Sequence, residues 1–288
     1  MKIVFFGEDS FSAQVLESLI FNQHEILAVF SPVYKNHIYA RLKVICEKQN
    51  IEFHRIKDIN SEKNEYLIRK LKPDLISVCH FQKILKKNII QIPLYGCINL
   101  HPSLLPNYRG LSPQHWPIIN GDIETGITVH FVDEGIDTGD IILQHKILID
   151  PDIYVSDLQL KMLDIYKFIV NDAITLIIND NINFVSQNKS QEGYYGKLKE
   201  EQCLIDLNDG YLNAYNLIRG VSMPYFGAKL NDYRIWKAKL ASKKLNDFIQ
   251  NKYNKNNIYF DEKIGTFIKF SDGSLIIEKY DRINNLKE

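Results

Sequence analysis

Apolar residues in the first hundred positions come in short continuous runs, and these runs alternate with segments in which apolar residues recur at helical spacing. Residues 2–6 form one such run, Gly7 ends it, and Asp9 or Ser10 is placed to cap a helix. Continuous apolar runs are typical of strands buried on both faces of a parallel sheet. The pattern predicts strands at 2–6, 25–31, 51–56, 74–80 and 95–101, and helices at 11–20, 39–50, 61–72 and 83–91.

The remainder of the chain adds further strands, a long helix and a β-rich end. The composition changes near 193–210. Before this change the pattern predicts strands at 124–135 and 139–149, an amphipathic helix at about 155–178 and a last strand at 182–187. After it the pattern predicts a helix at 211–220, strands within 227–240 and 265–280, an Asp272-Gly273 hairpin turn, and an exposed polar connection at 241–257.

Strands that alternate with helices indicate a parallel sheet wound by right-handed crossovers. The predicted fold class is therefore α/β. A Rossmann-like, mostly parallel sheet with flanking helices is expected in a first domain at 1–204. A smaller, β-rich C-terminal domain is expected at 205–288.

Two polar residues stand out at the end of the strand predicted at 95–101. Asn99 and His101 are two positions apart, so their side chains share one face of that strand. Ligands of parallel sheets bind beyond the carboxyl ends of the strands, where this pair lies. A lone histidine would be more simply explained as a core residue bonded to the backbone. Two polar groups on one face favour a functional site, with Asp137 in the glycine-rich loop 132–140 as a candidate third group.

Charge and cysteine content narrow the class of protein. Lys and Arg number 35, as do Asp and Glu, so a net basic field is absent and no nucleic-acid partner is expected. The four cysteines form no C-x-x-C pair, so we expect buried free thiols and no metal. Neither a signal peptide nor an apolar stretch of membrane-spanning length is recognised, so we expect a cytoplasmic protein without a membrane partner.

The stretch CINLHPSLLPNYRG at 97–110, followed by ETGITVHFVDEGIDTGDII at 124–142, resembles the folate-dependent formyltransferases. The resemblance covers about residues 1–200 and implies a formyltransferase catalytic domain. Such a domain takes the formyl group from 10-formyltetrahydrofolate and needs no metal. The family's catalytic Asn, His and Asp fall on Asn99, His101 and Asp137. Its folate-binding positions fall on His80, Phe81, Gln82, Lys83, Ile84, Leu85, Asp133, Gly135, Ile136 and Asp140.

The chemistry of formyl transfer suits these residue types. An amine attacks the formyl carbon, and negative charge develops on the formyl oxygen. Asn99 and a protonated His101 are expected to donate hydrogen bonds to that oxygen. Histidine can also carry the proton that the amine loses. Asp137 is expected to orient the imidazole, to favour its charged form and to accept the proton through water.

The resemblance also gives an expected acceptor, the amine of a nucleotide-linked amino sugar. Residues 213–240 are similar to the matching stretch of sugar-nucleotide N-formyltransferases. We expect dTDP-4-amino-4,6-dideoxyglucose as the substrate, in the synthesis of O-antigen or another surface polysaccharide. A homodimer through the C-terminal region is expected as well. The predicted substrate-binding residues are Pro102, Ser103, Arg109, Lys197, Arg219 and Tyr225.

Several alternatives stay open at this point. Methionyl-tRNA formyltransferases resemble the chain at 5–19, but their long basic loop after the second strand has only the short segment 31–43 as a counterpart. A formyltransferase acting on UDP-4-amino-4-deoxyarabinose is another alternative. A non-catalytic protein that binds folate or nucleotide represents a different class. Locally, Arg109 could equally brace its loop through an ion pair, and 224–227 could be a structural turn.

Overall fold

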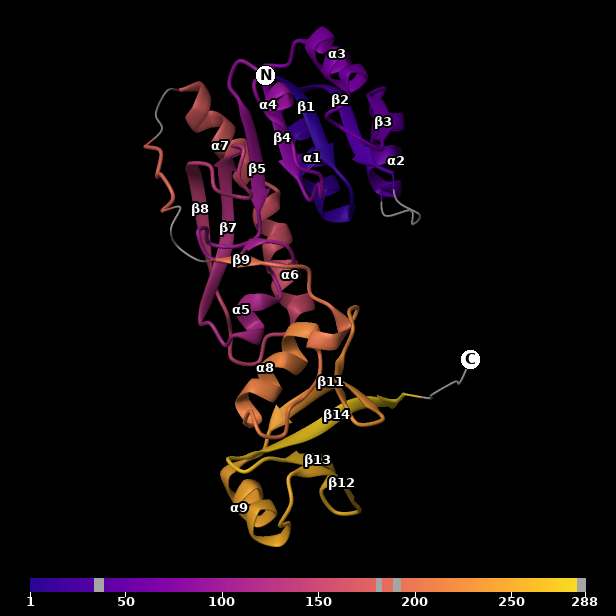
Figure 1. Cartoon of the computed structure of the whole chain (residues 1–288), viewed down its shortest axis with the longest axis vertical. Coiled ribbons are helices and arrows are strands. Elements are labelled where there is room, and N and C mark those ends of the chain that lie inside the picture. Colours follow the sequence, from indigo (N-terminus) through magenta and orange to yellow (C-terminus); the bar gives the residue numbers. More distant parts are fainter. Residues whose placement is uncertain (34–38, 180–182, 189–192, 284–288) are drawn as a thin grey trace. The chain divides into compact units, whose positions relative to one another are not determined.

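The computed structural model describes residues 1–33, 39–179, 183–188 and 193–283. The chain folds into two compact units, each assembled from three segments (Figure 1). The first unit comprises Met1–Gly110, Gly126–Ile147 and Lys161–Tyr195, and the second comprises Leu111–Thr125, Leu148–Leu160 and Gly196–Glu288.

A seven-stranded sheet forms the centre of the first unit, with the strand order β3-β2-β1-β4-β5-β7-β8. Strands β1 to β5 pair in parallel, and β7 pairs with β5 in the antiparallel direction. The predicted α/β class with a mostly parallel sheet is confirmed. The strands are β1 (Lys2–Gly7), β2 (Glu25–Pro32), β3 (Glu52–Ile56), β4 (Leu75–Cys79), β5 (Cys97–His101), β7 (Glu124–Phe131) and β8 (Ile141–Leu148).

Strand β1 is buried on both faces, as its continuous apolar run predicts. Val4 and Phe6 point to one face and belong to a core cluster that includes Ile68 and Ile89 from helices. Ile3 and Phe5 point to the other face and are also fully buried. Two-sided burial of this kind fixes the position of the whole strand, and therefore of the loop that follows it.

The helices of the first unit follow the predicted order with two differences. Helix α1 begins at its N-cap Asp9, whose carboxylate accepts the Phe11 and Ser12 N–H groups. Between residues 83 and 91 only a short helix forms. The single helix predicted at 155–178 is two helices, separated at residues 167–168. The helices are α1 (Ser10–Phe21), α2 (Ala40–Gln49), α3 (Glu62–Leu71), α4 (Lys87–Ile90), α7 (Ile169–Ile178) and α6 (Val155–Tyr166), whose first six residues are part of the second unit.

The last strand predicted at 182–187 is not formed as a regular strand in the residues that the structure describes there. Residue 182 lies outside the described residues. Of the others, Val185 forms an isolated antiparallel bridge with Ile141. A separate two-stranded ladder joins β6 (Arg109–Gly110) in parallel to β9 (Tyr194–Tyr195). This ladder ties the segment after β5 to a segment far along the chain.

The second unit contains a five-stranded antiparallel sheet in the order β10-β11-β14-β13-β12. The Asp272-Gly273 turn connects β13 to β14, as predicted. The polar segment 241–257, expected as a connection, instead contains helix α9, which buries Ile249. The elements are α5 (Trp116–Ile119), η1 (Glu200–Gln202), α8 (Tyr211–Val221), β10 (Ala228–Leu230), β11 (Tyr233–Leu240), α9 (Lys243–Lys252), β12 (Asn257–Asp261), β13 (Gly265–Lys269) and β14 (Ser274–Arg282).

All four cysteines are buried and unpaired. Burial raises the pKa of the Cys46 thiol to about 12 and that of Cys203 to about 11. None of the helices in the described part of the chain is long and apolar enough to cross a membrane.

Candidate active site

Asn99 and His101 lie on β5, the strand at which the sheet changes from parallel to antiparallel pairing. They share one face of that strand, as predicted from their spacing. The antiparallel neighbour β7 places His130 opposite Asn99 and Thr128 opposite His101. The change in direction therefore brings a second histidine to the pair.

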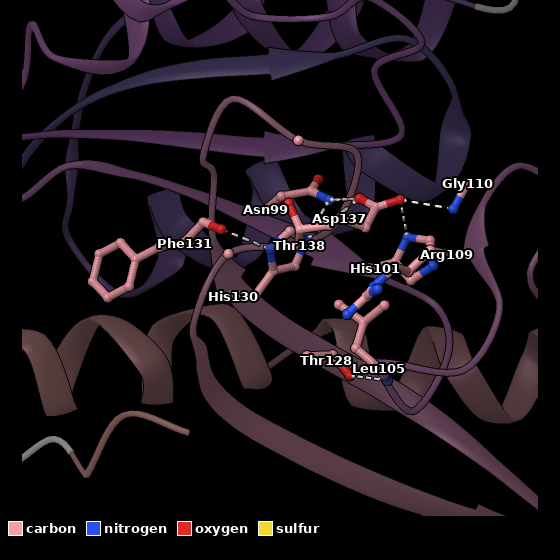
Figure 2. A network of polar contacts seen from close by, with 12 residues as sticks. Asn99, His101, Leu105, Arg109, Gly110, Thr128, His130, Phe131, Asp137 and Thr138 are labelled. Carbon is pink, nitrogen blue, oxygen red and sulfur yellow. Dashed lines mark hydrogen bonds and ion pairs between the residues drawn. The ribbon is translucent and has the colours of Figure 1, made fainter. Parts of the chain in front are cut away.

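Asp137 reaches this cluster from the loop between β7 and β8 (Figure 2). Its Oδ2 accepts the Gly110 N–H at 2.9 Å and lies 3.5 Å from His101 Nδ1. Its Oδ1 accepts a hydrogen bond from Asn99 Nδ2 at 3.3 Å and lies 3.5 Å from His130 Nε2. The structure thus brings together the three predicted catalytic residues.

The hydrogen bonds of His101 define which of its nitrogens is available for proton transfer. Its Nε2–H donates to the Tyr108 carbonyl at 2.8 Å, because a carbonyl oxygen can only accept. In the neutral ring the lone pair is therefore on Nδ1, the atom that faces Asp137. His101 is 4% exposed, and this burial lowers its pKa, with Asp137 offsetting only part of the effect.

The lowered pKa corrects one expectation from the sequence. A protonated His101 was expected to donate a hydrogen bond to the developing oxyanion. Burial favours the neutral ring instead, so His101 is arranged as a proton acceptor at Nδ1. Burial alone would raise the pKa of Asp137, but positive charge on His101 or His130 and the hydrogen bond from the Gly110 N–H lower it, and the lowering prevails. Asp137 is therefore a carboxylate.

His130 was not singled out from the sequence. Its Nδ1–H donates to the Phe131 carbonyl at 2.7 Å, so Nε2 is the acceptor of its neutral ring. Asn99 Nδ2 donates one hydrogen to this Nε2, at 3.1 Å, and the other to Asp137. These acceptors fix the orientation of the Asn99 amide. In the sequence, His130 is a polar residue inside an otherwise apolar strand. That it lies opposite Asn99 follows only from the pairing of β5 with β7.

The loop after β5 is held by internal bonds rather than open to a ligand. Thr128 Oγ1 donates to the Ser103 carbonyl at 2.7 Å and accepts the Leu105 N–H at 3.1 Å. Pro102, Ser103 and Arg109 were expected to contact substrate, but all of them are buried. Ser103 Oγ donates to the Asn107 carbonyl at 2.6 Å, so its hydroxyl is used within the loop.

The predicted folate loop after β4 consists of anchoring and exposed residues. His80 Nδ1 lies 2.9 Å from Asp9 Oδ2, and its Nε2 lies 3.0 Å from the Tyr166 hydroxyl. Phe81 stacks on Phe6 with 5.1 Å between ring centroids. Gln82 donates its N–H to Glu8, Leu85 is in the core, Lys83 is half-buried and Ile84 is 66% exposed.

The second predicted folate segment lies in the loop that carries Asp137. Asp133 accepts the Gly135 N–H at 3.0 Å and the Thr138 hydroxyl at 2.6 Å, while the Asp140 carbonyl accepts the Phe131 N–H. Ile136 is 44% exposed. Both loops carry an exposed apolar side chain, and the loop after β4 lies at the carboxyl edge of the parallel strands, where ligands of such sheets bind.

Three predicted substrate residues belong to the second unit. Lys197 is exposed. Arg219 is 4% exposed and donates to the Ile153 carbonyl at 2.9 Å and to Asn216. Tyr225 is half-buried, and its hydroxyl accepts a hydrogen bond from Gln159. The Arg219 guanidinium is thus used inside the unit. Among the described residues, no group of three or more His, Cys, Asp or Glu side chains could hold a metal ion.

An Asn-His-Asp cluster at the carboxyl edge of a Rossmann-like sheet, followed by an antiparallel second unit, defines the class of protein. The formyl transferase family matches residues 1–174, and its C-terminal domain matches residues 197–288. The chain belongs to the formyl transferase family and is a folate-dependent formyltransferase.

Curated relatives are similar along nearly the whole chain. A methionyl-tRNA formyltransferase of Fusobacterium nucleatum is 35% identical in an alignment 287 positions long that covers 96% of this chain and 91% of the relative. One from Clostridioides difficile is 34% identical, covering 85% of this chain and 82% of its own length. The expected acceptor, a nucleotide-linked amino sugar such as dTDP-4-amino-4,6-dideoxyglucose, is therefore wrong. The predicted roles of Lys197, Arg219 and Tyr225 as substrate contacts stay predictions.

Solved structures with the same fold include sugar N-formyltransferases. WlaRD, a sugar 3N-formyl transferase, has a TM-score of 0.70 at 24% identity and covers 99% of both chains. The N-formyltransferase from Helicobacter canadensis, in complex with folinic acid and dTDP-3-aminofucose, has a TM-score of 0.70 at 21% identity and covers 98% of this chain and all of its own. At these identities the likeness concerns the fold alone.

Proposed function

We propose that this protein transfers the formyl group of 10-formyltetrahydrofolate to the amino group of methionyl-tRNA. The observation that carries the proposal is the likeness to methionyl-tRNA formyltransferases, which runs through both units rather than the first alone. A catalytic domain shared with other formyltransferases would not distinguish the acceptor. The methionyl-tRNA formyltransferases are 34–35% identical to this chain, whereas the sugar N-formyltransferases that match both units are 24% identical or less, so the former support a shared acceptor.

The distribution of charge along the chain also supports an RNA acceptor. The net charge is zero, but residues 197–288 carry 16 Lys and Arg against 12 Asp and Glu, so the remainder carries an equal negative excess. Proteins bind RNA largely through Lys and Arg contacts to phosphates. The zero net charge of the whole chain was the argument against an RNA partner, because a sum over the chain does not show that the two parts differ in charge. The short segment 31–43, which stands where methionyl-tRNA formyltransferases have a long basic loop, also argued against RNA. Its residues 34–38 lie outside the described residues.

The geometry assigns separate tasks to the catalytic residues. When bound, the folate supplies the formyl group. As the amine forms its new bond to the formyl carbon it must lose a proton, and His101 Nδ1 is a basic nitrogen that can accept it. From His101 the same proton can pass to the folate nitrogen that leaves when its bond to the formyl carbon breaks, so that tetrahydrofolate is released. Asp137 stabilises the imidazolium that results. Asn99 donates a hydrogen bond to the formyl oxygen as negative charge grows on it, exchanging one of the two bonds that its amide makes in the free protein.

The test is the transfer of labelled formyl from 10-formyltetrahydrofolate to a panel of acceptors. Initiator methionyl-tRNA should be formylated, whereas dTDP-4-amino-4,6-dideoxyglucose and UDP-4-amino-4-deoxyarabinose should not. The KM for tRNA should rise steeply with salt, while that for the folate changes little. Asp137→Asn serves as the inactive control. Transfer to either sugar nucleotide without transfer to tRNA would overturn the proposal.

A further inference from the structure

A buried glutamine that sequence reasoning passed over connects two parts of the catalytic cluster. Gln187 is 8% exposed. Its Nε2 donates to the carbonyls of Asp137 and Gly139, at 2.9 and 2.6 Å. Its Oε1 accepts from Arg109 Nε at 3.1 Å and from an Arg109 terminal nitrogen at 2.7 Å. Because carbonyls only accept and a guanidinium only donates, the amide has one possible orientation and uses its full bonding capacity.

The backbone that Gln187 holds is one that needs restraint. Asp137 has a φ of +52°, in the left-handed region that residues other than glycine adopt at a cost of about 1 kcal/mol or more. The segment is also closely packed, because a Cβ on Gly139 would lie 1.9 Å from the Phe131 carbonyl oxygen. An aspartate on such a backbone points its carboxylate correctly only while the surrounding structure maintains the conformation.

Arg109 acts on Asp137 by two routes. Through Gln187 it reaches the main-chain carbonyl of Asp137, and through the next residue, Gly110, it is linked to the carboxylate, which accepts the Gly110 N–H at 2.9 Å. Gly110 has a φ of +96°, and a Cβ there would lie 2.5 Å from the Tyr195 carbonyl oxygen. This position therefore requires glycine and brings the N–H close to Asp137.

We propose that Gln187 and Arg109 are positioning residues for formyl transfer, which together hold the Asp137 carboxylate against His101 Nδ1. Neither side chain belongs to the predicted proton path. The inference rests on the proposed role of Asp137. It gives a reason for a guanidinium buried beside the catalytic strand, because two of its nitrogens donate to the amide that holds the catalytic loop.

The test uses the full chain and a readout that needs no acceptor. Gln187→Leu removes the amide at nearly constant volume, and the ring of His101 is titrated by NMR in the free protein. Asp137 raises the pKa of His101, so a displaced carboxylate lowers that pKa further. We expect a downward shift of the His101 titration, a decrease in kcat of about 10- to 100-fold and little change in KM for the folate. An unchanged titration and an unchanged kcat would overturn the inference.

A second variant and a matched control separate positioning from folding. Gln187→Glu keeps the acceptor for Arg109 but turns an oxygen toward the two carbonyls, so a decrease in kcat is expected without loss of the arginine bond. Gln250 also donates its amide to two carbonyls, those of Phe270 and Gly273, each at 3.1 Å. Gln250→Leu should leave the His101 titration unchanged, and an equal shift in that variant would contradict the inference. A fully active Asp137→Asn would refute the role of Asp137 itself, whatever Gln187 does.

Discussion

Two histidine–aspartate pairs lie at the same edge of the first unit's sheet, and their histidines have opposite pKa shifts. His80 follows β4 and His101 ends β5, the parallel neighbour of β4. His101 is buried, lies 3.5 Å from Asp137, and has a lowered pKa. His80 lies 2.9 Å from Asp9. Burial would lower its pKa too, but Asp9 and Glu8 outweigh burial and raise it.

The comparison shows that an adjacent carboxylate does not by itself charge a histidine. Direct contact with Asp9 and a second acidic group raise the pKa of His80, whereas burial lowers the pKa of His101, which lies farther from its carboxylate. The pair with the raised histidine pKa anchors a predicted cofactor loop. The pair with the lowered histidine pKa favours an unprotonated ring nitrogen that can accept a proton.

The largest expected effect on kcat comes from removing the carboxylate of the His101–Asp137 pair. Asp137→Asn should lower kcat by about 10²- to 10⁴-fold with little change in KM, because an amide cannot stabilise the imidazolium formed at His101. Steady-state kinetics at saturating folate measure this. The matched variant Asp9→Asn should act mainly on the KM for the folate. Equal kcat losses in the two variants would remove the distinction between the pairs.

The histidines themselves sharpen the comparison. His101→Gln should lower kcat by about 10²-fold or more, since the proton acceptor is lost. His80→Gln should instead raise the KM for the folate, because His80 fixes the loop through Asp9 and Tyr166. A thermal-shift titration with folinic acid measures the second effect without catalysis. Normal folate affinity in His80→Gln would argue against the predicted cofactor loop.

The pH dependence of the rate tests the neutral state of His101. Its pKa lies below the ordinary value of 6.5, so kcat should be constant from about pH 6.5 to 8 and fall only as acid protonates the ring. Single-turnover formyl transfer between pH 5 and 8 provides the measurement. A rate that already declines between pH 8 and 7 would mean that His101 is charged in the working enzyme.

The smallest effect concerns the pH dependence of stability. A raised folded-state pKa means that the His80–Asp9 pair stabilises the fold fully below about pH 6.5 and loses this contribution as pH rises through the folded-state value. The free energy of unfolding of the wild type should therefore exceed that of His80→Gln by about 1–3 kcal/mol at pH 6, and by less at pH 9. Urea unfolding of both proteins at pH 6 and pH 9 measures this difference in stability. A difference that is larger at pH 9 than at pH 6 would contradict the prediction.

Much of the fold was readable from the sequence because local patterns specify it. Continuous apolar runs identified β1 and β4, and the two-residue spacing placed Asn99 and His101 on one face. His130 could not be placed, because its partner Asn99 is joined to it through antiparallel pairing between distant segments. Gln187 was missed for the same reason, since its bonds reach residues 109, 137 and 139.

Other differences have physical causes as well. Helix α9 was missed because its polar composition hides a narrow apolar side, of which Ile249 is the buried member. The prediction of a sugar-nucleotide acceptor was wrong because it rested on residues 213–240, a stretch that also lies within the likeness to methionyl-tRNA formyltransferases. The predicted boundary after residue 204, the homodimer and the roles of the folate residues stay predictions.

The burial of every thiol provides a way to observe opening of the molecule. Alkylating reagents attack the thiolate, and all four sulfurs are shielded in the folded protein. Cys46, Cys79 and Cys97 belong to the first unit, while Cys203 belongs to the second. Pulse labelling followed by peptide mass analysis would therefore report separately when each unit exposes its interior, using reporters already built into the chain.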